Sequence, residues 1–488
     1  MKICFAISEC VPFIKTGGLA DVGGALPKAL ADAGCEVKVF LPLYAAVNIL
    51  EHELVFVEAL QNVPVQVAGK TVAFNVWCGN LPESDVPVYF IECPAYFQRP
   101  EIYTRHADED ERFIFFQLAI LAVMQRLQWS PDLVHCNDWQ TALLPVYLKI
   151  NFSLDKLFAQ TATMLSIHNI GYQGRFPKES LHRAGLPDEH FYPGGPFEID
   201  EKFCFLKAGL MFADVITTVS ETYAQEIQTH TYGAGLDGVL ANRKQDLFGI
   251  LNGIDTREWN PKIDLRLPFR YSLRNIDNKL KNKRALLSYV QLPFDENIAT
   301  IGMVTRLVAQ KGLELLPPII EALMRLPLQL VILGSGEMEY EFFLQRTAQT
   351  FPFQFHATIG YDHDLSHLIT AGCDLFLMPS RYEPCGLNQM YSLNYGTVPI
   401  VRKTGGLADT VHDYHEFYEE GNGFSFQEYS AHSLLLTVRR ALDVFPDKKV
   451  WKKIMKRGMQ QDFSWDASAK RYVELYRKTK KRLQKVSY

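Results

Sequence analysis

Short apolar segments of strand length alternate with segments of helical spacing along most of the chain. Residues 3–8 are predicted to form a buried strand, and a turn is predicted at Gly17-Gly18. A helix follows, which Gly34 ends, and its apolar positions are Leu19, Val22, Leu26 and Leu30. A second strand is predicted over residues 37–43. This β-α-β pattern predicts a parallel sheet.

The same alternation continues in two blocks that a polar, proline-containing stretch at residues 252–297 separates. Further strands are predicted at residues 133–136, 164–167, 215–219, 298–304, 328–333, 353–359, 374–378 and 398–401. Two such blocks predict an α/β chain with two doubly wound domains, whose strands end at a cleft between them. We place the domains at residues 1–250 and 251–463. A last amphipathic helix is predicted at residues 464–488, packing back on the first domain, with the apolar stripe Tyr472, Leu475, Tyr476 and Leu483.

Composition narrows the class of protein. A chain of 488 residues with 48% hydrophobic residues can bury two large cores. The formal net charge of -5 predicts no general attraction to nucleic acid or to an anionic membrane. The nine cysteines include no C-x-x-C pair, and no apolar run reaches membrane-spanning length. These features, with no signal peptide pattern at the N-terminus, lead us to expect a cytoplasmic protein.

The first candidate for chemistry is the segment KTGGLADV at residues 15–22. A strand stops, two glycines follow, and a helix begins, so unpaired N–H groups and the positive end of the helix dipole meet there. Lys15 adds a full charge, and Gly17 and Gly18 allow a phosphate to approach the backbone. An anion site and an ordinary tight turn with a solvated lysine explain this pattern equally well.

Two further candidates follow predicted strands of the second block. Arg306 and Lys311 come after the strand at residues 298–304, and two cations at that end of a strand suit a diphosphate. Glu383 comes after the strand at residues 374–378, in a turn that Pro384 and Gly386 make before a helix begins. A carboxylate there suits sugar hydroxyls and positive charge at a sugar carbon, although carboxylates near helix starts are also common without a function.

Together these segments resemble the bacterial and plastid type of the glycogen (starch) synthase family. The resemblance extends to HCNDW at residues 135–139, IHNIGYQG at 167–174, YGAGLDG at 232–238, NGID at 252–255 and TGGLADTV at 404–411, which echoes the first segment. It covers nearly the whole chain in order. The chain departs from the family pattern at Cys136-Asn137, where Ala-His is typical, and at Asn388, where Thr is typical.

The resemblance implies a retaining two-domain glycosyltransferase of the GT-B fold, which transfers glucose from ADP-glucose, with UDP-glucose as the alternative, to the non-reducing end of an α-1,4-glucan. It implies the catalytic residues Glu383, His168, Arg306 and Lys311. The implied donor-binding residues are Lys15, Gly17, Gly18, Asn252, Arg306, Lys311, Tyr361, Glu383, Cys385, Gly386 and Leu387. The implied acceptor-binding residues are Asp138, Trp139, Tyr96 and Asp21. No cofactor or metal is expected, since the cationic side chains of Lys15, Arg306 and Lys311 would neutralise the leaving diphosphate.

Several alternatives remain at this point. Glu383 by its type suits a nucleophile in a double displacement, whereas the resemblance favours front-face attack in which the departing phosphate accepts the proton. Other functions are a GT-B enzyme making a small glucoside and a glucan-binding protein without activity. The D-x-D at residues 108–110 is interpreted as a helix-leading acidic group rather than a metal site. His363 and His367 are interpreted as a solvated helix face.

Overall fold

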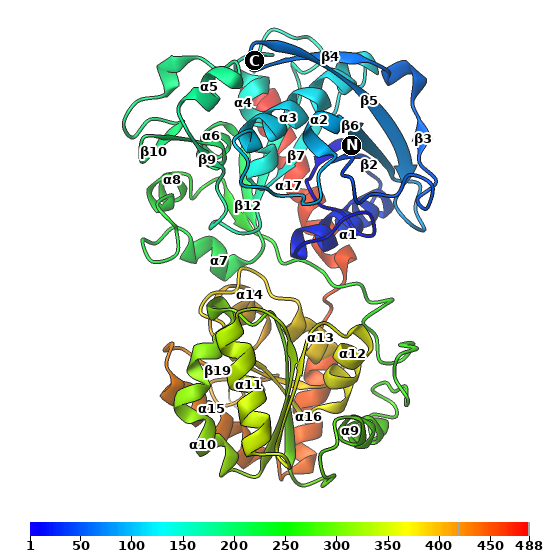
Figure 1. Cartoon of the computed structure of the whole chain (residues 1–488), viewed down its shortest axis with the longest axis vertical. Coiled ribbons are helices and arrows are strands. Elements are labelled where there is room, and N and C mark those ends of the chain that lie inside the picture. Colours follow the sequence, from blue (N-terminus) through cyan, green and yellow to red (C-terminus); the bar gives the residue numbers. More distant parts are fainter. Residues whose placement is uncertain (418–419, 487–488) are drawn as a thin grey trace. The chain divides into compact units, whose positions relative to one another are not determined.

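The computed structural model describes residues 1–417 and 420–486 (Figure 1). The chain forms two compact α/β units. The first comprises Met1–Gly253 together with Trp465–Tyr488, and the second comprises Ile254–Ser464. The sequence analysis placed the corresponding boundaries at residues 250/251 and 463/464.

A sheet of ten strands forms the centre of the first unit, in the order β13-β12-β8-β7-β1-β2-β6-β5-β3, with β4 paired to β5. Seven strands from β13 to β6 are parallel. They are β1 (Lys2–Ala6), β2 (Glu36–Pro42), β6 (Pro87–Glu92), β7 (Leu133–Asn137), β8 (Ala162–Ile167), β12 (Val215–Thr218) and β13 (Leu247–Gly249). The prediction of a parallel sheet from the first β-α-β unit is confirmed, and helix α1 (Gly18–Asp32) connects β1 to β2.

The far edge of this sheet is antiparallel and was not predicted. It contains β3 (Val55–Phe56), β4 (Val63–Val67) and the long strand β5 (Lys70–Asn80), which pairs with β6. Only Phe74 and Val76 of β5 are buried, so the strand does not form a continuous apolar run. A small sheet of β9 (Arg175–Phe176), β10 (Glu198–Ile199) and β11 (Lys202–Cys204) also lies in this unit.

The second unit contains a sheet of six parallel strands in the order β16-β15-β14-β17-β18-β19. They are β14 (Ala299–Val304), β15 (Leu328–Gly334), β16 (Phe355–Ile359), β17 (Leu375–Met378), β18 (Val398–Arg402) and β19 (Phe424–Phe426). The first five confirm the predicted strands. Because β14 and β17 are neighbours, the loops that follow them start at the same edge of the sheet.

Helices cover both sheets, as Figure 1 shows. In the first unit the longer ones are α3 (Glu109–Arg126), α4 (Leu144–Lys149), α6 (Phe205–Phe212), α7 (Glu221–Glu226) and α8 (Asp237–Asn242). In the second they are α9 (Asn278–Tyr289), α10 (Ile320–Met324), α11 (Met338–Thr350), α12 (His363–Gly372), α13 (Asn388–Asn394), α14 (Gly405–Thr410), α15 (Ala431–Val444) and α16 (Lys448–Met459). Within the described residues, no helix is both long and apolar enough to cross a membrane.

The last helix, α17 (Trp465–Val486), belongs to the first unit although it follows the second in sequence. Figure 1 shows it in red beside the blue helix α1. Tyr472 and Tyr476 of its apolar stripe are buried, and the Tyr476 hydroxyl lies 2.7 Å from Nδ1 of His135 in β7. The helix expected at residues 464–488 is therefore present as α17, and it packs on the first unit as expected.

Candidate active site

The Lys15 loop of the first unit is organised by a carboxylate of the protein itself. Glu9, only 3% exposed, accepts hydrogen bonds from Thr16 N at 2.5 Å, Thr16 Oγ1 at 2.7 Å and Gly17 N at 3.1 Å. Lys15 Nζ lies 2.7 and 2.9 Å from the two carboxylate oxygens of Asp21, one turn into α1. The Gly17 amide, expected to face a phosphate, is therefore engaged by Glu9, and the charge of Lys15 is paired.

Two pairs of glycines in α1 serve different purposes. A Cβ added at Gly23 would lie 2.5 Å from the carbonyl oxygen of Glu9, and one at Gly24 would lie 2.3 Å from Cγ2 of Val11. These two glycines let the helix pack against the preceding loop. At Gly17 and Gly18 an added Cβ would meet nothing within 4 Å. Packing inside the protein therefore does not require glycine there, and the open space suits the approach of a ligand to the backbone.

His168 follows β8 and is held from two sides. Its backbone N–H donates to Oδ1 of Asp138 at 2.7 Å, and its Nε2 lies 2.9 Å from Oδ1 of Asn137. Burial lowers the pKa of His168 to about 4, so the ring is neutral near pH 7. Burial also raises the pKa of Asp138 to about 7, although backbone hydrogen bonds from His168 and Asn169 oppose this rise.

Asn137 determines which nitrogen of His168 carries the proton. Its amide nitrogen donates to the carbonyl oxygen of Ala6 at 3.0 Å, which turns the amide oxygen toward His168. An oxygen there accepts a hydrogen bond, so Nε2 of His168 is protonated and Nδ1 is a lone-pair acceptor. The sequence analysis noted Asn137 only as a departure from a family pattern. Its position directly before Asp138, at the end of a buried strand, was the available signal.

Two aromatic residues assigned to the acceptor, Tyr96 and Trp139, are largely buried. Tyr96, 4% exposed, packs against Phe115 with ring centroids 5.0 Å apart, and its hydroxyl bonds to Glu111. Its ring has no exposed face on which a sugar could stack, so this expectation is corrected. Trp139, 8% exposed, packs against Phe113 at 4.9 Å. Asp138 is also 8% exposed and accepts a hydrogen bond from His168 N. Both residues are as accessible as Glu383, which is 6% exposed, so their assignment to the acceptor stays a prediction.

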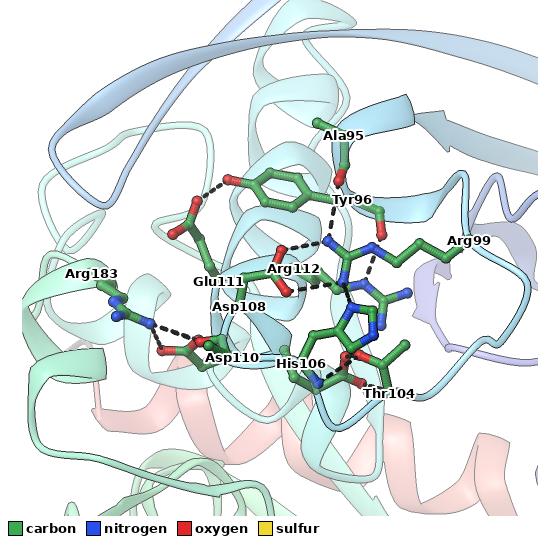
Figure 2. A network of polar contacts seen from close by, with 12 residues as sticks. Ala95, Tyr96, Arg99, Thr104, His106, Asp108, Asp110, Glu111, Arg112 and Arg183 are labelled. Carbon is green, nitrogen blue, oxygen red and sulfur yellow. Dashed lines mark hydrogen bonds and ion pairs between the residues drawn. The ribbon is translucent and has the colours of Figure 1, made fainter.

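The D-x-D at the start of α3 consists of carboxylates that already have cationic partners. Figure 2 shows this network, in which Asp108 and Asp110 face guanidinium groups and Glu111 accepts from the Tyr96 hydroxyl. The pairs are Asp108 with Arg99, Glu109 with Arg112 and Asp110 with Arg183. Arg112 is completely buried. These ion pairs explain why acidic residues gather here and support the interpretation that they are structural rather than metal ligands.

The second unit brings Lys311 and Glu383 together, 72 residues apart in sequence. Lys311 Nζ lies 2.9 and 2.6 Å from the two carboxylate oxygens of Glu383, and Ser380 Oγ donates to the same carboxylate at 2.9 Å. Gly312, with φ +76°, allows this approach, because a Cβ would lie 2.1 Å from the carbonyl oxygen of Pro379. Arg306 is exposed, and no side chain in the described part of the chain pairs with its guanidinium.

Tight turns hold the Glu383 loop in place. Gly386 has φ +72°, in the left-handed region, and is followed directly by Leu387 and α13. Cys385 is buried. Asn388 donates from Nδ2 to the carbonyl oxygen of Val304 at 2.7 Å and so links this loop to the end of β14. The loops that carry Arg306 and Glu383 are therefore fixed to each other.

The remaining candidates differ in exposure. Asn252 of the first unit, expected to hold glucose, is 8% exposed, and its buried Oδ1 has no hydrogen-bond partner among the residues that the structure describes. Tyr361 of the second unit is 79% exposed, so its ring is accessible, and its contact with a base stays a prediction. The interpretation of His363 and His367 as a solvated helix face is wrong, because His367 is completely buried.

Comparison with known proteins identifies the family. The family model for the starch synthase catalytic domain matches residues 2–242, and the model for glycosyl transferases group 1 matches residues 289–457. A glycogen synthase from Thermosipho melanesiensis is 46% identical over 479 residues, 98% of this chain and 99% of that protein. The chain belongs to the glycogen and starch synthase family. It is accordingly a glycosyltransferase rather than a glucan-binding protein without activity.

Solved structures agree with this assignment. The catalytic domain of starch synthase IV from Arabidopsis thaliana, bound to ADP and acarbose, has a TM-score of 0.87 and 33% identity, and the match covers 98% of this chain and 99% of that chain. Sucrose-phosphate synthase from Thermosynechococcus elongatus has a TM-score of 0.59 and 18% identity, and 98% of each chain is covered. The second similarity shows the fold alone. Both confirm the predicted two-domain GT-B architecture.

Proposed function

We propose that this family member transfers glucose from ADP-glucose to the non-reducing 4-OH of an α-1,4-glucan, with retention of the α configuration. The observation that carries this proposal is the pairing of Lys311 with Glu383, on a loop that Asn388 links to the end of β14, which the exposed Arg306 follows. A leaving nucleoside diphosphate develops negative charge while the sugar carbon develops positive charge. Cations and a carboxylate fixed side by side stabilise both charges in one transition state.

Each residue set has a distinct role in this proposal. Arg306 and Lys311 neutralise the leaving diphosphate, and Lys15 adds to this charge, so the reaction uses no cofactor and no metal. His168 is neutral and offers Nδ1 as an acceptor for a hydroxyl of the transferred glucose, because Asn137 holds its Nε2–H. Tyr361 covers the base. Asp138 and Trp139 bind the acceptor.

The surroundings of Glu383 favour a role as charge stabiliser over a role as nucleophile. Both of its oxygens are engaged by Lys311, and one also accepts from Ser380. A carboxylate held this way is a weak nucleophile, but its negative charge still opposes the developing cation. We propose front-face attack, in which the departing phosphate accepts the proton of the 4-OH and closes the proton balance.

The donor assignment is supported by the starch synthase IV structure, which is bound to ADP. ADP is the leaving group of ADP-glucose, whereas UDP-glucose would release UDP. The alternative, an enzyme that makes a small glucoside, is tested by varying the acceptor. A glucan synthase requires the end of a polymer or oligomer as its acceptor.

The test is an assay of nucleoside diphosphate release by EDTA-treated protein with ADP-glucose or UDP-glucose, with and without glycogen. We expect ADP release that requires glycogen and no added divalent ion, and a glucan lengthened by α-1,4 linkages. Glu383→Gln, which keeps the shape of the side chain, should lower kcat by about 10²–10³. Preference for UDP-glucose, or activity that only Mg²⁺ restores, would contradict the proposal.

A further inference from the structure

Two imidazoles and one carboxylate converge in the second unit, outside the residues assigned to the transfer reaction. His363 and His367 lie one turn apart on α12, so both rings project from the same face of the helix. Glu258 approaches them from the segment that follows the start of the unit at Ile254. Side chains from two segments about a hundred residues apart therefore meet at one point.

The ligand atoms are close enough to share one ion. Nε2 of His363 lies 3.0 Å from Nε2 of His367 and 3.1 Å from Oε1 of Glu258. The three atoms all lie within 4.8 Å of one another. Around a tetrahedral ion with bonds of about 2.0–2.1 Å, neighbouring ligand atoms are about 3.3 Å apart. Two of the three separations are within a few tenths of an ångström of that value, and the third, between Nε2 of His367 and Glu258, is at most 4.8 Å.

The tautomer of His367 is set from behind. Its Nδ1 lies 2.7 Å from Oδ2 of Asp264, a carboxylate that is 3% exposed and also accepts from the Tyr395 hydroxyl at 2.7 Å. The Nδ1–H donates to this carboxylate, so Nε2 keeps its lone pair and directs it at His363. A carboxylate behind a metal-binding histidine is the usual arrangement in proteins, where it fixes the ring and raises its basicity.

Packing holds the group in place and leaves one side open. The indole of Trp259 stacks on His367 with centroids 3.8 Å apart and an interplanar angle of 16°. The side chains of His363 and Glu258 are 37% and 40% exposed, so an ion can enter from solvent. The nearby cation Arg266 is paired with Asp364 at 3.0 Å and is thus neutralised.

We propose that Glu258, His363 and His367 form a binding site for a divalent transition metal ion such as Zn²⁺. Two imidazoles and one carboxylate suit Zn²⁺ and its neighbours Co²⁺, Ni²⁺ and Cu²⁺, whereas Mg²⁺ and Ca²⁺ prefer oxygen ligands alone. Three protein ligands leave a further position for water. The ion joins the segment at residues 254–264 to α12, and so acts on the stability of the second unit rather than on the transfer of glucose.

The competing explanation is a simple hydrogen bond. A proton on Nε2 of His363 can be donated to Nε2 of His367 without any ion, and Glu258 then lies beside the same N–H. This arrangement predicts no stoichiometric affinity for Zn²⁺. The two explanations therefore differ in a direct binding measurement.

The experiment uses the full chain without a histidine tag, stripped with EDTA and then freed of it. Titration with Zn²⁺ against a chromophoric chelator should show one high-affinity equivalent, and Co²⁺ should give the visible absorption bands of a low-coordinate complex. Zn²⁺ should also raise the melting temperature, since a ligand that binds only the folded state stabilises it. His363→Ala and Glu258→Gln should each weaken binding by at least about 100-fold, more than loss of a supporting partner does.

The matched control is His182→Ala, which removes an exposed histidine of the first unit that lies 3.7 Å from the carboxylate of Asp188. This variant should bind Zn²⁺ as the unmodified chain does. His363→Ala in EDTA should melt normally, since the residue is half exposed, so that loss of binding is not loss of fold. Absence of a stoichiometric site, or Zn²⁺ affinity unchanged in both ligand variants, would overturn the proposal. Glycogen-dependent ADP release in EDTA tests the proposed reaction separately.

Discussion

The heptapeptide KTGGLAD occurs twice, at residues 15–21 in the first unit and at residues 403–409 in the second. In both places it leads from a strand into a helix, α1 in one case and α14 in the other. The glycines are used in opposite ways. Added Cβ atoms at Gly17 and Gly18 would meet nothing within 4 Å, but those at Gly405 and Gly406 would lie 2.0 Å from carbonyl oxygens of the Glu383 loop.

The lysines differ in the same way. Lys15 pairs with Asp21 inside its own heptapeptide, whereas Lys403 pairs with Glu416 outside it. Identical residues thus form an open end facing solvent in one unit and a packed support for Glu383 in the other. Local sequence determines that a helix starts after two glycines, while the neighbouring chain determines whether a ligand can reach them.

The largest expected effect comes from adding a methyl group to the heptapeptide at residues 403–409, where the glycines are closely packed. Gly406→Ala places a Cβ 2.0 Å from the carbonyl oxygen of Cys385, so backbone must move and the Glu383 loop with it. We expect a loss of more than about 3 kcal/mol in the stability of the second unit and a collapse of kcat. Circular dichroism melting and the ADP-release assay measure both effects.

Gly18→Ala is the control for this prediction. Its Cβ enters open space at the first position of a helix. The free energy of unfolding should therefore change by no more than about 0.5 kcal/mol, with a correspondingly small change in melting temperature. If Gly406→Ala melts like Gly18→Ala, the contrast between a packed and an open glycine pair is wrong.

The second prediction compares the two lysines. Lys15→Ala and Lys403→Ala each remove one ion pair with an exposed or partly exposed partner, so both should cost at most about 1 kcal/mol of stability. Only Lys15 is proposed to act on the leaving diphosphate. We therefore expect kcat/KM to fall by about 10² for Lys15→Ala and by less than about twofold for Lys403→Ala. Equal losses in the steady-state assay would remove the distinction between the two copies.

The smallest expected effect concerns Asp138. Burial raises the pKa of its carboxyl group, and the negative charge of Glu9, which organises the Lys15 loop, also raises it. Its folded-state pKa of about 7 lies above the unfolded value of about 3.9, so the folded state binds the extra proton between these values. The resulting stabilisation is complete below pH 4 and is lost as pH rises toward 7. Between pH 5 and pH 7 the loss is about 2 kcal/mol.

Asp138→Asn should remove this pH dependence, because the amide oxygen still accepts from His168 N but cannot titrate. The measurement is the difference in melting temperature between pH 5 and pH 7 in the two proteins. A difference of the same size in both would show that Asp138 does not titrate in this range.

Strands whose residues are almost all buried could be predicted from the sequence, whereas the partly exposed strand β5 could not. β1 and β15 are buried along nearly their whole length, so each is a continuous apolar run that the sequence displays. β5 is half exposed and carries polar residues among its apolar ones, which gives no such run. It becomes a strand because β6 and β4 offer hydrogen-bond partners on both sides.

The candidate site shows the same limit. The type and order of Lys311 and Glu383 were visible, but their contact follows from β14 and β17 being neighbours, which a linear sequence does not state. His367 looked solvated because periodicity on α12 gives no sign of the Trp259 segment that covers it. In the sequence, Asn137 is only a departure from the family pattern. Its role in orienting His168 depends on the contact between β7 and the residue after β8, which the sequence does not display.

The position of α17 has a consequence for biosynthesis. The first unit needs this helix, since Tyr476 bonds to His135 across 341 positions of the chain. During translation that unit stays incomplete until α17 leaves the ribosome, whereas the second unit, which precedes α17 in sequence, is already whole. The second unit also begins and ends at adjacent points, because Ile254 N donates to the carbonyl oxygen of Phe463 at 2.8 Å. It is therefore an insertion that a nascent chain can fold first.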